Sequence, residues 1–154
     1  MTFIFEAMPT DYARKIQNGG LDVHGQKPDR TVSDGQGNPC RHCLKQVPEG
    51  RGMLILAYKP FSGTNAYTET GPIFLCEDEC ARHQGDSVPE ITKDAEAYLM
   101  RGYNEDERIV YGAGDVIAKS DMSTYANALF ENPEITEIHV RSKKYNCFQF
   151  KIKR

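Results

Sequence analysis

The chain has 154 residues and a net charge of −3, with 39% hydrophobic and 27% charged residues. These values are typical of one globular domain with a substantial core, and they argue against a disordered chain or a nucleic-acid coat. The longest apolar run, residues 53–58, is far shorter than the roughly 20 residues of a membrane span, and residues 1–6 lack the basic start of a secretory signal. We therefore expect a soluble, cytoplasmic protein with a single domain over residues 1–154.

The first half of the chain predicts three strands and one helix. Residues 3–8 are typical of a short strand, and residues 9–11 open a short helix that ends at residues 18–20. Residues 19–39 are rich in Gly, Asp, Asn and Pro, which predicts a long loop. Two apolar runs, residues 53–59 and 71–76, are typical of buried strands.

The second half predicts strands over residues 97–103, 108–111 and 116–118, followed by a helix over residues 121–131. The helix is indicated by one apolar stripe, formed by Met122, Tyr125, Ala126, Leu129 and Phe130. A terminal hairpin is predicted over residues 135–141 and 147–153. Many strands, few helices and no regular β-α-β alternation together predict an α+β fold, with a mostly antiparallel sheet and a few short helices.

Four of the five cysteines form two closely spaced pairs, Cys40-x2-Cys43 and Cys76-x3-Cys80. A tetrahedral zinc site needs four ligands, with each cysteine sulfur about 2.3 Å from the metal. One pair on a tight turn supplies half of such a site. The strands predicted between the pairs return the chain so that the second pair can supply the other half. We expect a structural zinc site at these four cysteines, with His83 as an alternative fourth ligand.

Two other interpretations of these cysteines stay open. A Cys-x-x-Cys pair at Cys40 and Cys43 also suits dithiol redox chemistry, and buried free cysteines often act only as small hydrophobic residues. Three acidic residues lie between Cys76 and Cys80, and nearby carboxylates raise the pKa of a thiol. Because a bound dication would reverse that effect, the charge pattern favours a metal site over a free dithiol.

The C-terminal hairpin alternates apolar and polar residues. The apolar set, Ile138, Val140, Phe148, Phe150 and Ile152, is expected to share the core face. The opposite face would then carry His139, Arg141, Cys147, Gln149, Lys151 and Lys153. This arrangement requires a loop with an odd number of residues. A three-residue loop with Asn146 in the left-handed conformation suits it, and residues 143–145 are the alternative loop.

The same hairpin is strongly basic. Residues 141–154 contain six basic and no acidic residues, so they carry +6, which leaves −9 for residues 1–140 from the total of −3. Cationic neighbours such as Arg141 and Lys143 lower the pKa of a thiol, which makes Cys147 a candidate nucleophile and His139 a candidate base. The alternatives are an inert buried Cys147, a structural His139, and lysines that protect an edge strand from aggregation.

Several motifs carry a resemblance to a known family. They are Cys40-Arg41-His42-Cys43-Leu44, residues 67–74, Arg101-Gly102-Tyr103, His139-Val140-Arg141, Cys147-Phe148 and Arg154. In these pieces the chain resembles domain of unknown function 1203, a family of bacterial proteins. The resemblance implies a small, cytoplasmic, single-domain protein and no particular activity. The family often has histidine at the position of Cys76, and because histidine also binds zinc this departure leaves a metal site possible.

Together the patterns predict a zinc-stabilised small binding module. Its ligand-binding residues would be Arg101, Arg141 and Lys143, and its partner an anionic small molecule or protein, with nucleic acid and membranes disfavoured. The alternative is a cysteine-dependent enzyme that uses Cys147 with Arg141 and His139, or a dithiol redox protein at the first cysteine pair.

Overall fold

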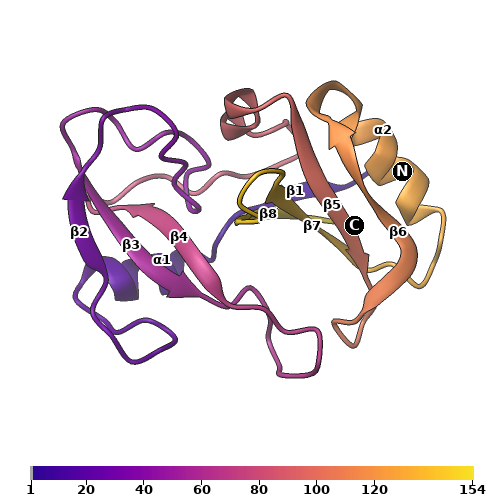
Figure 1. Ribbon diagram of the computed structural model, residues 1–154, viewed down its shortest axis with the longest axis horizontal. Coiled ribbons are helices and arrows are strands. Elements are labelled where there is room, and N and C mark those ends of the chain that lie inside the picture. Colours follow the sequence, from indigo (N-terminus) through magenta and orange to yellow (C-terminus); the bar gives the residue numbers. More distant parts are fainter. Residues whose placement is uncertain (1) are drawn as a thin grey trace.

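The computed structural model describes residues 2–154, which form two antiparallel sheets lying side by side (Figure 1). The large sheet has the strand order β1-β8-β7-β5-β6, with β1 (Ile4–Glu6), β5 (Ala97–Tyr103), β6 (Ile109–Ala118), β7 (Glu137–Ser142) and β8 (Phe148–Lys153). The small sheet has the order β2-β3-β4, with β2 (Asp29–Val32), β3 (Gly52–Tyr58) and β4 (Gly71–Cys76). Two α-helices, α1 (Thr10–Gln17) and α2 (Met122–Phe130), and two 3-10 turns, Glu90–Asp94 and Lys119–Asp121, complete the described elements. The predicted α+β fold with antiparallel sheets is confirmed.

One face of the large sheet is apolar and packs against α2. The register places Met100, Val140 and Phe150 in one row across β5, β7 and β8, and Ile138 pairs with Ile152 in the next. The helix contributes its own apolar stripe to this core, as the sequence predicts, through Met122, Ala126, Leu129 and Phe130. Burial of these side chains removes a large apolar area from water, which is the main stabilising contribution to this half of the protein.

The other face of the large sheet is polar. Arg101, His139 and Lys151 form one row across β5, β7 and β8, and Tyr103, Glu137 and Lys153 form the next. Arg141 lies on the same face, two residues beyond His139 on β7. We call these seven residues the polar face. It is covered by the β3–β4 loop, residues 59–70, which brings Phe61 and Glu69 from the small sheet into contact with it.

The small sheet has a second core, which includes three of the clustered cysteines. Helix α1 packs on it through Ala13 and Ile16, against buried residues of β3 and β4 such as Leu56 and Leu75. None of the helices described within residues 2–154 is long and apolar enough to cross a membrane.

Two elements differ from the sequence predictions. The predicted long loop over residues 19–39 contains β2, which pairs with β3 although all four of its residues are exposed. The two short strands predicted at 108–111 and 116–118 are one strand, β6, with an irregularity in its pairing to β5 between Arg101 and Tyr103. Gly112 adopts φ +92° there, and glycine tolerates this left-handed conformation, so the chain stays in the sheet instead of turning.

The face assignment of the hairpin is also corrected. Ser142 donates its backbone N–H to the Cys147 carbonyl, and Arg141 lies opposite Phe148, so the loop has four residues and not three. The pairing then shifts by one residue between Val140 and Arg141, so Phe150 lies opposite Val140 and its side chain is on the core face. Consequently Phe148 lies on the polar face beside Arg141, and Cys147 lies on the opposite face. Asn146 does adopt the left-handed conformation, with φ +58°.

We expect Ile138→Ala to lower the free energy of unfolding by about 2–5 kcal/mol, because it leaves a cavity in the core between the sheet and α2. Ile138 is fully buried. Val116→Ala on β6, where the side chain is 44% exposed, is the matched control and should change stability by less than about 1 kcal/mol. Chemical denaturation checks both variants, and equal losses would contradict the assignment of the core to this face.

Candidate metal centre and anion-binding cleft

The four paired cysteines meet at one point of the small sheet. The Sγ atoms of Cys40, Cys43, Cys76 and Cys80 all lie within 4.8 Å of one another. Four sulfur atoms at about 2.3 Å from a shared tetrahedral metal would be about 3.8 Å apart, and the Cys40 and Cys80 Sγ atoms are 3.9 Å apart. All five cysteines are free thiols. The soft, buried donor set therefore fits a bound metal ion.

A tight turn presents the first pair of cysteines. The Leu44 backbone N–H donates to the Cys40 carbonyl at 2.9 Å, and Leu44 adopts a left-handed φ of +54°. Such a conformation is unfavourable for leucine, yet its fully buried side chain packs in the core of the large sheet. The second pair starts at the end of β4, which brings Cys76 next to the turn: the Cys76 N–H lies 3.4 Å from the Cys40 Sγ.

Helix α1 supports this cluster with polar residues spaced on one helical stripe. Thr10 Oγ1 lies 2.9 Å from His42 Nε2, and His42 Nδ1 lies 3.1 Å from the Cys80 Sγ. Arg14 and Gln17 donate to the carbonyls of Cys80 and Cys76, at 2.9 and 2.8 Å. These contacts fix the second cysteine pair, and the sequence analysis missed them. The spacing 10, 14 and 17 is the pattern that could have indicated them.

The thiols influence one another strongly. Hydrogen bonds within the cluster lower the pKa of Cys40 and that of Cys43, whereas the same crowding raises the pKa of Cys76 and Cys80. The first pair thus favours the thiolate form, and the second pair resists losing its protons. A divalent cation would remove that resistance, because metal binding and thiol deprotonation are coupled. His83 is not part of the four-sulfur group.

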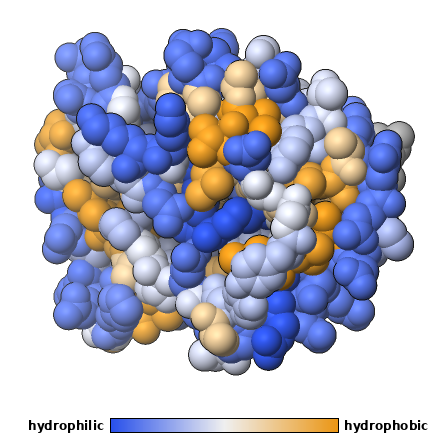
Figure 2. All heavy atoms as spheres, turned by 45° about the vertical axis from the view of Figure 1, so that its right-hand side comes forward, coloured by the Kyte–Doolittle hydropathy of each residue, from blue (hydrophilic) through white to orange (hydrophobic). Residues whose placement is uncertain are grey.

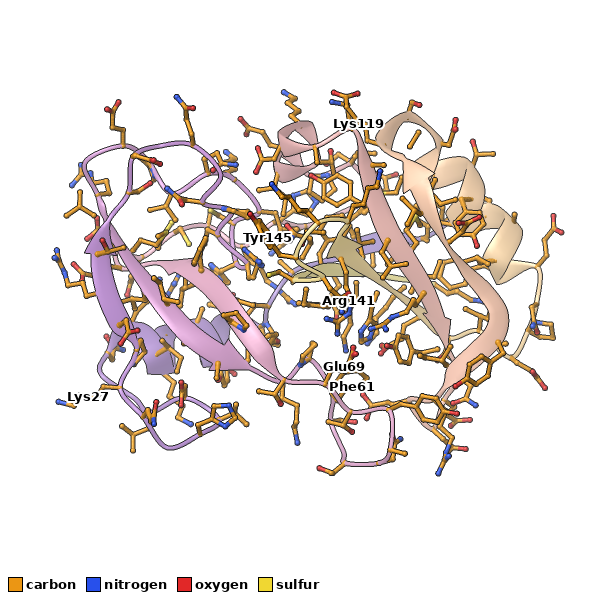
Figure 3. All side chains as sticks on the ribbon, in the orientation of Figure 1. Lys27, Phe61, Glu69, Lys119, Arg141 and Tyr145 are labelled. Atoms are coloured by element: carbon orange, nitrogen blue, oxygen red, sulfur yellow. The ribbon has the colours of Figure 1, made fainter. Side chains whose placement is uncertain are left out.

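The second candidate site lies on the polar face, where Arg101 and Arg141 share the carboxylate of Glu69. Arg101 is ion-paired to Glu69, and Arg141 Nη2 lies 2.8 Å from the same carboxylate oxygen. The two arginine side chains are only 17% and 6% exposed. Figure 3 shows Arg141 and Glu69 pointing toward one another in the space between the two sheets. Glu69 comes from the β3–β4 loop, so no sequence spacing relates it to either arginine.

His139 and Glu137 form a buried pair beside the arginines. His139 Nε2 lies 2.9 Å from Glu137 Oε1, and both side chains are less than 10% exposed. Burial lowers the pKa of His139 to about 4, so the imidazole is neutral near pH 7. Burial acts to raise the pKa of Glu137, but the hydrogen bond with His139 and the charges of Lys151 and Lys153 outweigh it and hold this pKa at about 2.

Aromatic rings enclose the histidine. The Tyr103 ring centroid is 4.2 Å from that of His139, and the Phe61 and Phe148 centroids are 5.0 and 5.5 Å away. Phe61 comes from the β3–β4 loop, is 6% exposed and also contacts Tyr103. The loop therefore closes the inner part of the polar face.

A cleft of about 790 Å³ opens between the two sheets at Arg141 and Glu69. Its other walls are mostly apolar or hydroxyl-bearing, and include Tyr58, Thr70 and Phe148. Figure 2 shows one group of strongly hydrophilic atoms in the middle of one face of the molecule, next to hydrophobic patches. The cleft is of a size that accepts a small organic molecule.

The remaining predicted site residues lie around this cleft. Cys147 lines its rim, where its thiol is 3.8 Å from the Tyr145 carbonyl, and Lys143 is exposed in the hairpin loop. Within residues 2–154, no hydrogen bond or ion pair joins Cys147 to His139 or to the Arg141 guanidinium. Arg101 and Arg141 are thus brought together, whereas Lys143 is not part of their cluster.

A family model described as "Protein of unknown function (DUF1203)" matches residues 37–154. This range contains all four clustered cysteines, both arginines and Glu69. The chain belongs to this family. The searches of curated proteins and of solved structures found no match. Membership in DUF1203 confirms the resemblance seen in the motifs, and its description assigns no activity, so the function has to be argued from the two sites.

We expect this DUF1203 protein to bind one divalent metal ion per chain through the four paired cysteines. Cys40→Ser should lose the metal and lower the thermal unfolding midpoint, because metal binding stabilises only the folded state. Cys147→Ser leaves the four-cysteine cluster intact, so this variant should keep the bound metal and the wild-type unfolding midpoint. Elemental analysis and thermal unfolding of protein purified without an affinity metal check this, and a metal-free wild type with an unchanged Cys40→Ser variant would contradict it.

We also expect stability to fall as the pH falls from about 6.5 to 4. In this window the unfolded histidine binds a proton that buried His139 does not, so acid favours the unfolded chain by up to about 3 kcal/mol. His139→Gln keeps a side-chain donor for Glu137 and does not titrate, so its unfolding free energy should depend less steeply on pH. Equal slopes for the two proteins in denaturant titrations would contradict the neutral, buried state of His139.

Proposed function

We propose that this protein is a zinc-stabilised binding module whose partner is a small anionic molecule bound at Arg101 and Arg141. The single observation that supports this most strongly is the excess of buried positive charge at the cleft. Arg141 and Glu69 line the cleft, and Arg101 shares the Glu69 carboxylate. Among the residues that the structure describes, Arg101 Nε and Arg141 Nε are buried without a hydrogen-bond partner. Buried donors without partners are costly, and a bound anion would satisfy them.

The charge balance of the surrounding face agrees with this proposal. Lys151 and Lys153 are both ion-paired to Glu137, and Lys153 also pairs with Glu6. The charges of these two lysines and two glutamates sum to zero, and His139 adds no charge because it is neutral. The arginine pair with its single carboxylate therefore keeps one uncompensated positive charge, which favours an anionic over a neutral ligand.

Zinc is the metal that the four-cysteine donor set favours, since tetrahedral sites with four thiolate ligands are typical of structural zinc. A reducing compartment such as the cytoplasm would keep the thiols available for the metal. In this proposal the metal has no part in ligand chemistry and acts by holding the small sheet and its loops in place.

The cysteine-dependent alternatives have less support. Cys147 lines the rim of the cleft, but within residues 2–154 no hydrogen bond joins its thiol to the Arg141 guanidinium, and His139 Nε2 is occupied by Glu137. The redox alternative needs a dithiol pair free of metal, whereas Cys40 and Cys43 lie within one group of four sulfur atoms.

We expect acetate and inorganic phosphate to bind at the arginine pair, and the binding to depend on Arg141. Arg141→Gln should weaken it about tenfold or more, because a charge-assisted bidentate contact is lost. Glu69→Gln should strengthen it, because the intramolecular competitor loses its charge. Lys144→Gln, in the exposed hairpin loop, is the matched control for removal of a positive charge and should change little.

Two-dimensional NMR titrations of the four proteins measure these affinities and locate the shifted resonances. Support requires that the shifts centre on β5, β7 and the β3–β4 loop in the wild type. The absence of saturable shifts at these elements with both anions, in the wild type and in Glu69→Gln, would overturn the proposed function.

A further inference from the structure

The buried polar atoms that lack a partner are concentrated on one patch of the polar face. Within residues 2–154 they include Arg101 Nε, Tyr103 Oη, His139 Nδ1 and Arg141 Nε, one from each of four residues of β5 and β7. Two others come from Arg82 and His83, outside this face. Native proteins leave few buried polar groups unpaired, so a group of four in one place indicates something that pairs with them.

The sheet register places these four residues side by side. Arg101 and His139 are directly opposite each other on β5 and β7. Tyr103 is two residues from Arg101, and Arg141 two residues from His139, so all four side chains leave the same face. Neighbouring positions in this group start roughly 5–8 Å apart, whereas Tyr103 and Arg141 lie at its opposite ends. The side chains nevertheless converge, because the Tyr103 ring centroid is 4.2 Å from that of His139 and both arginines meet at Glu69. One small molecule at the position of the Glu69 carboxylate can therefore lie close to all four.

The hydrogen-bonding character of each atom follows from its chemistry. The two arginine nitrogens, Arg101 Nε and Arg141 Nε, can only donate. His139 is neutral and its Nε2 faces the ionised Glu137 carboxylate, which can only accept, so Nε2 carries the proton and Nδ1 is an acceptor. The Tyr103 hydroxyl can donate or accept. The patch thus offers several donors beside an acceptor that needs an O–H or N–H from the ligand.

A simple anion satisfies only part of this set. Acetate or sulfate can accept from the arginines, but neither has a proton to donate to His139 Nδ1, which would stay buried and unpaired. A ligand that carries a hydroxyl group next to its carboxylate can satisfy both kinds of atom at once. The carboxylate is indicated because the chain itself places a carboxylate, that of Glu69, on the arginine pair.

We propose that the ligand is a small hydroxy acid. Its carboxylate takes the place of the Glu69 carboxylate on Arg101 and Arg141, and its hydroxyl group donates a hydrogen bond to His139 Nδ1 and contacts the Tyr103 hydroxyl. This inference rests on the proposed function and specifies the ligand class of the same site.

The β3–β4 loop has to move for this ligand to enter. Glu69 is partly exposed at the cleft, whereas Phe61 covers Tyr103 and His139. The loop is held to the β5–β6 turn by Glu107, which accepts from the backbone N–H groups of Ser62 and Gly63. The loop is therefore held closed by polar contacts at Ser62, Gly63 and Glu69 and by the aromatic contacts of Phe61, and ligand entry has to break part of this set.

Matched acids that differ only in the hydroxyl group test this inference. We would titrate lactate against propionate, and malate against succinate, into the wild type and Glu69→Gln, following the resonances of β5 and β7 by NMR. The expected result is a preference of about tenfold or more for the hydroxy acid of each pair, since a lost hydrogen bond leaves a buried group unpaired.

The outcomes separate this inference from the proposed function. Equal affinities within each pair would overturn the hydroxy-acid assignment and leave anion binding intact, with water as the partner of His139 Nδ1. If none of the four acids binds at these strands, the proposed function fails as well.

Two variants test the separate roles of His139 Nδ1 and of the Tyr103 hydroxyl group. His139→Gln keeps a donor for Glu137 but lacks the Nδ1 acceptor, so it should bind lactate no better than propionate while its propionate affinity is unchanged. Tyr103→Phe should reduce the preference without abolishing it, and Tyr111→Phe on exposed β6 is its matched control. A preference for lactate that survives in His139→Gln would contradict the assigned role of Nδ1. If that variant does not fold, the wild-type comparison of matched acids still decides.

Discussion

The ion-pair cluster in which Glu69 bridges Arg101 and Arg141 is the interaction on which the arrangement of the two sheets depends. Both arginines belong to the large sheet and Glu69 to a loop of the small one. A buried guanidinium without a counter-charge is strongly destabilising, so the large sheet cannot expose this face to an apolar partner. The β3–β4 loop supplies the missing carboxylate, and in doing so it holds the small sheet against the large one. The apolar contacts of Phe61 follow from the position of that loop.

The metal centre is connected to the β3–β4 loop through strand β4. β4 begins at Gly71, two residues after Glu69, and ends at Cys76 of the cysteine cluster. A second connection runs through Arg41, which follows Cys40 and donates from Nε to the Phe148 carbonyl on β8. Burial lowers the pKa of Arg41 to about 10, which still leaves it charged near pH 7. A metal bound by the cysteines would therefore fix Cys76, at the end of the strand that follows Glu69, and Cys40, next to Arg41, so its stabilising effect would extend toward the cleft.

The sequence predicts local features well and distant contacts poorly. The spacing of the cysteine pairs and the apolar stripe of α2 depend on nearby residues, so both could be found from periodicity and motif spacing. The side chains that lie on each face of the hairpin could not be predicted in the same way. A four-residue loop followed by a pairing shift leaves residues 150–153 in the register that a loop with an odd number of residues would give. The sequence prediction therefore assigned Phe148 and Cys147 to the wrong faces. Glu69 could not be found at all, since it is 32 residues from Arg101 and no repeating pattern connects them. The basic hairpin did indicate Arg141, but two of its other basic residues, Lys151 and Lys153, are ion-paired to Glu137.

The role of Glu69 also shows why a site with two buried arginines can be stable before a ligand arrives. If the pair had no counter-charge, folding would have to overcome the desolvation of both guanidinium groups. With Glu69 in place, ligand binding exchanges one carboxylate for another, so the Coulomb energy of the arginines changes little. Affinity then depends on what the ligand offers beyond its charge, namely hydrogen bonds to groups that Glu69 leaves unpaired. In the proposed site, simple anions would therefore bind more weakly than molecules that also match the neutral imidazole of His139 and the hydroxyl group of Tyr103.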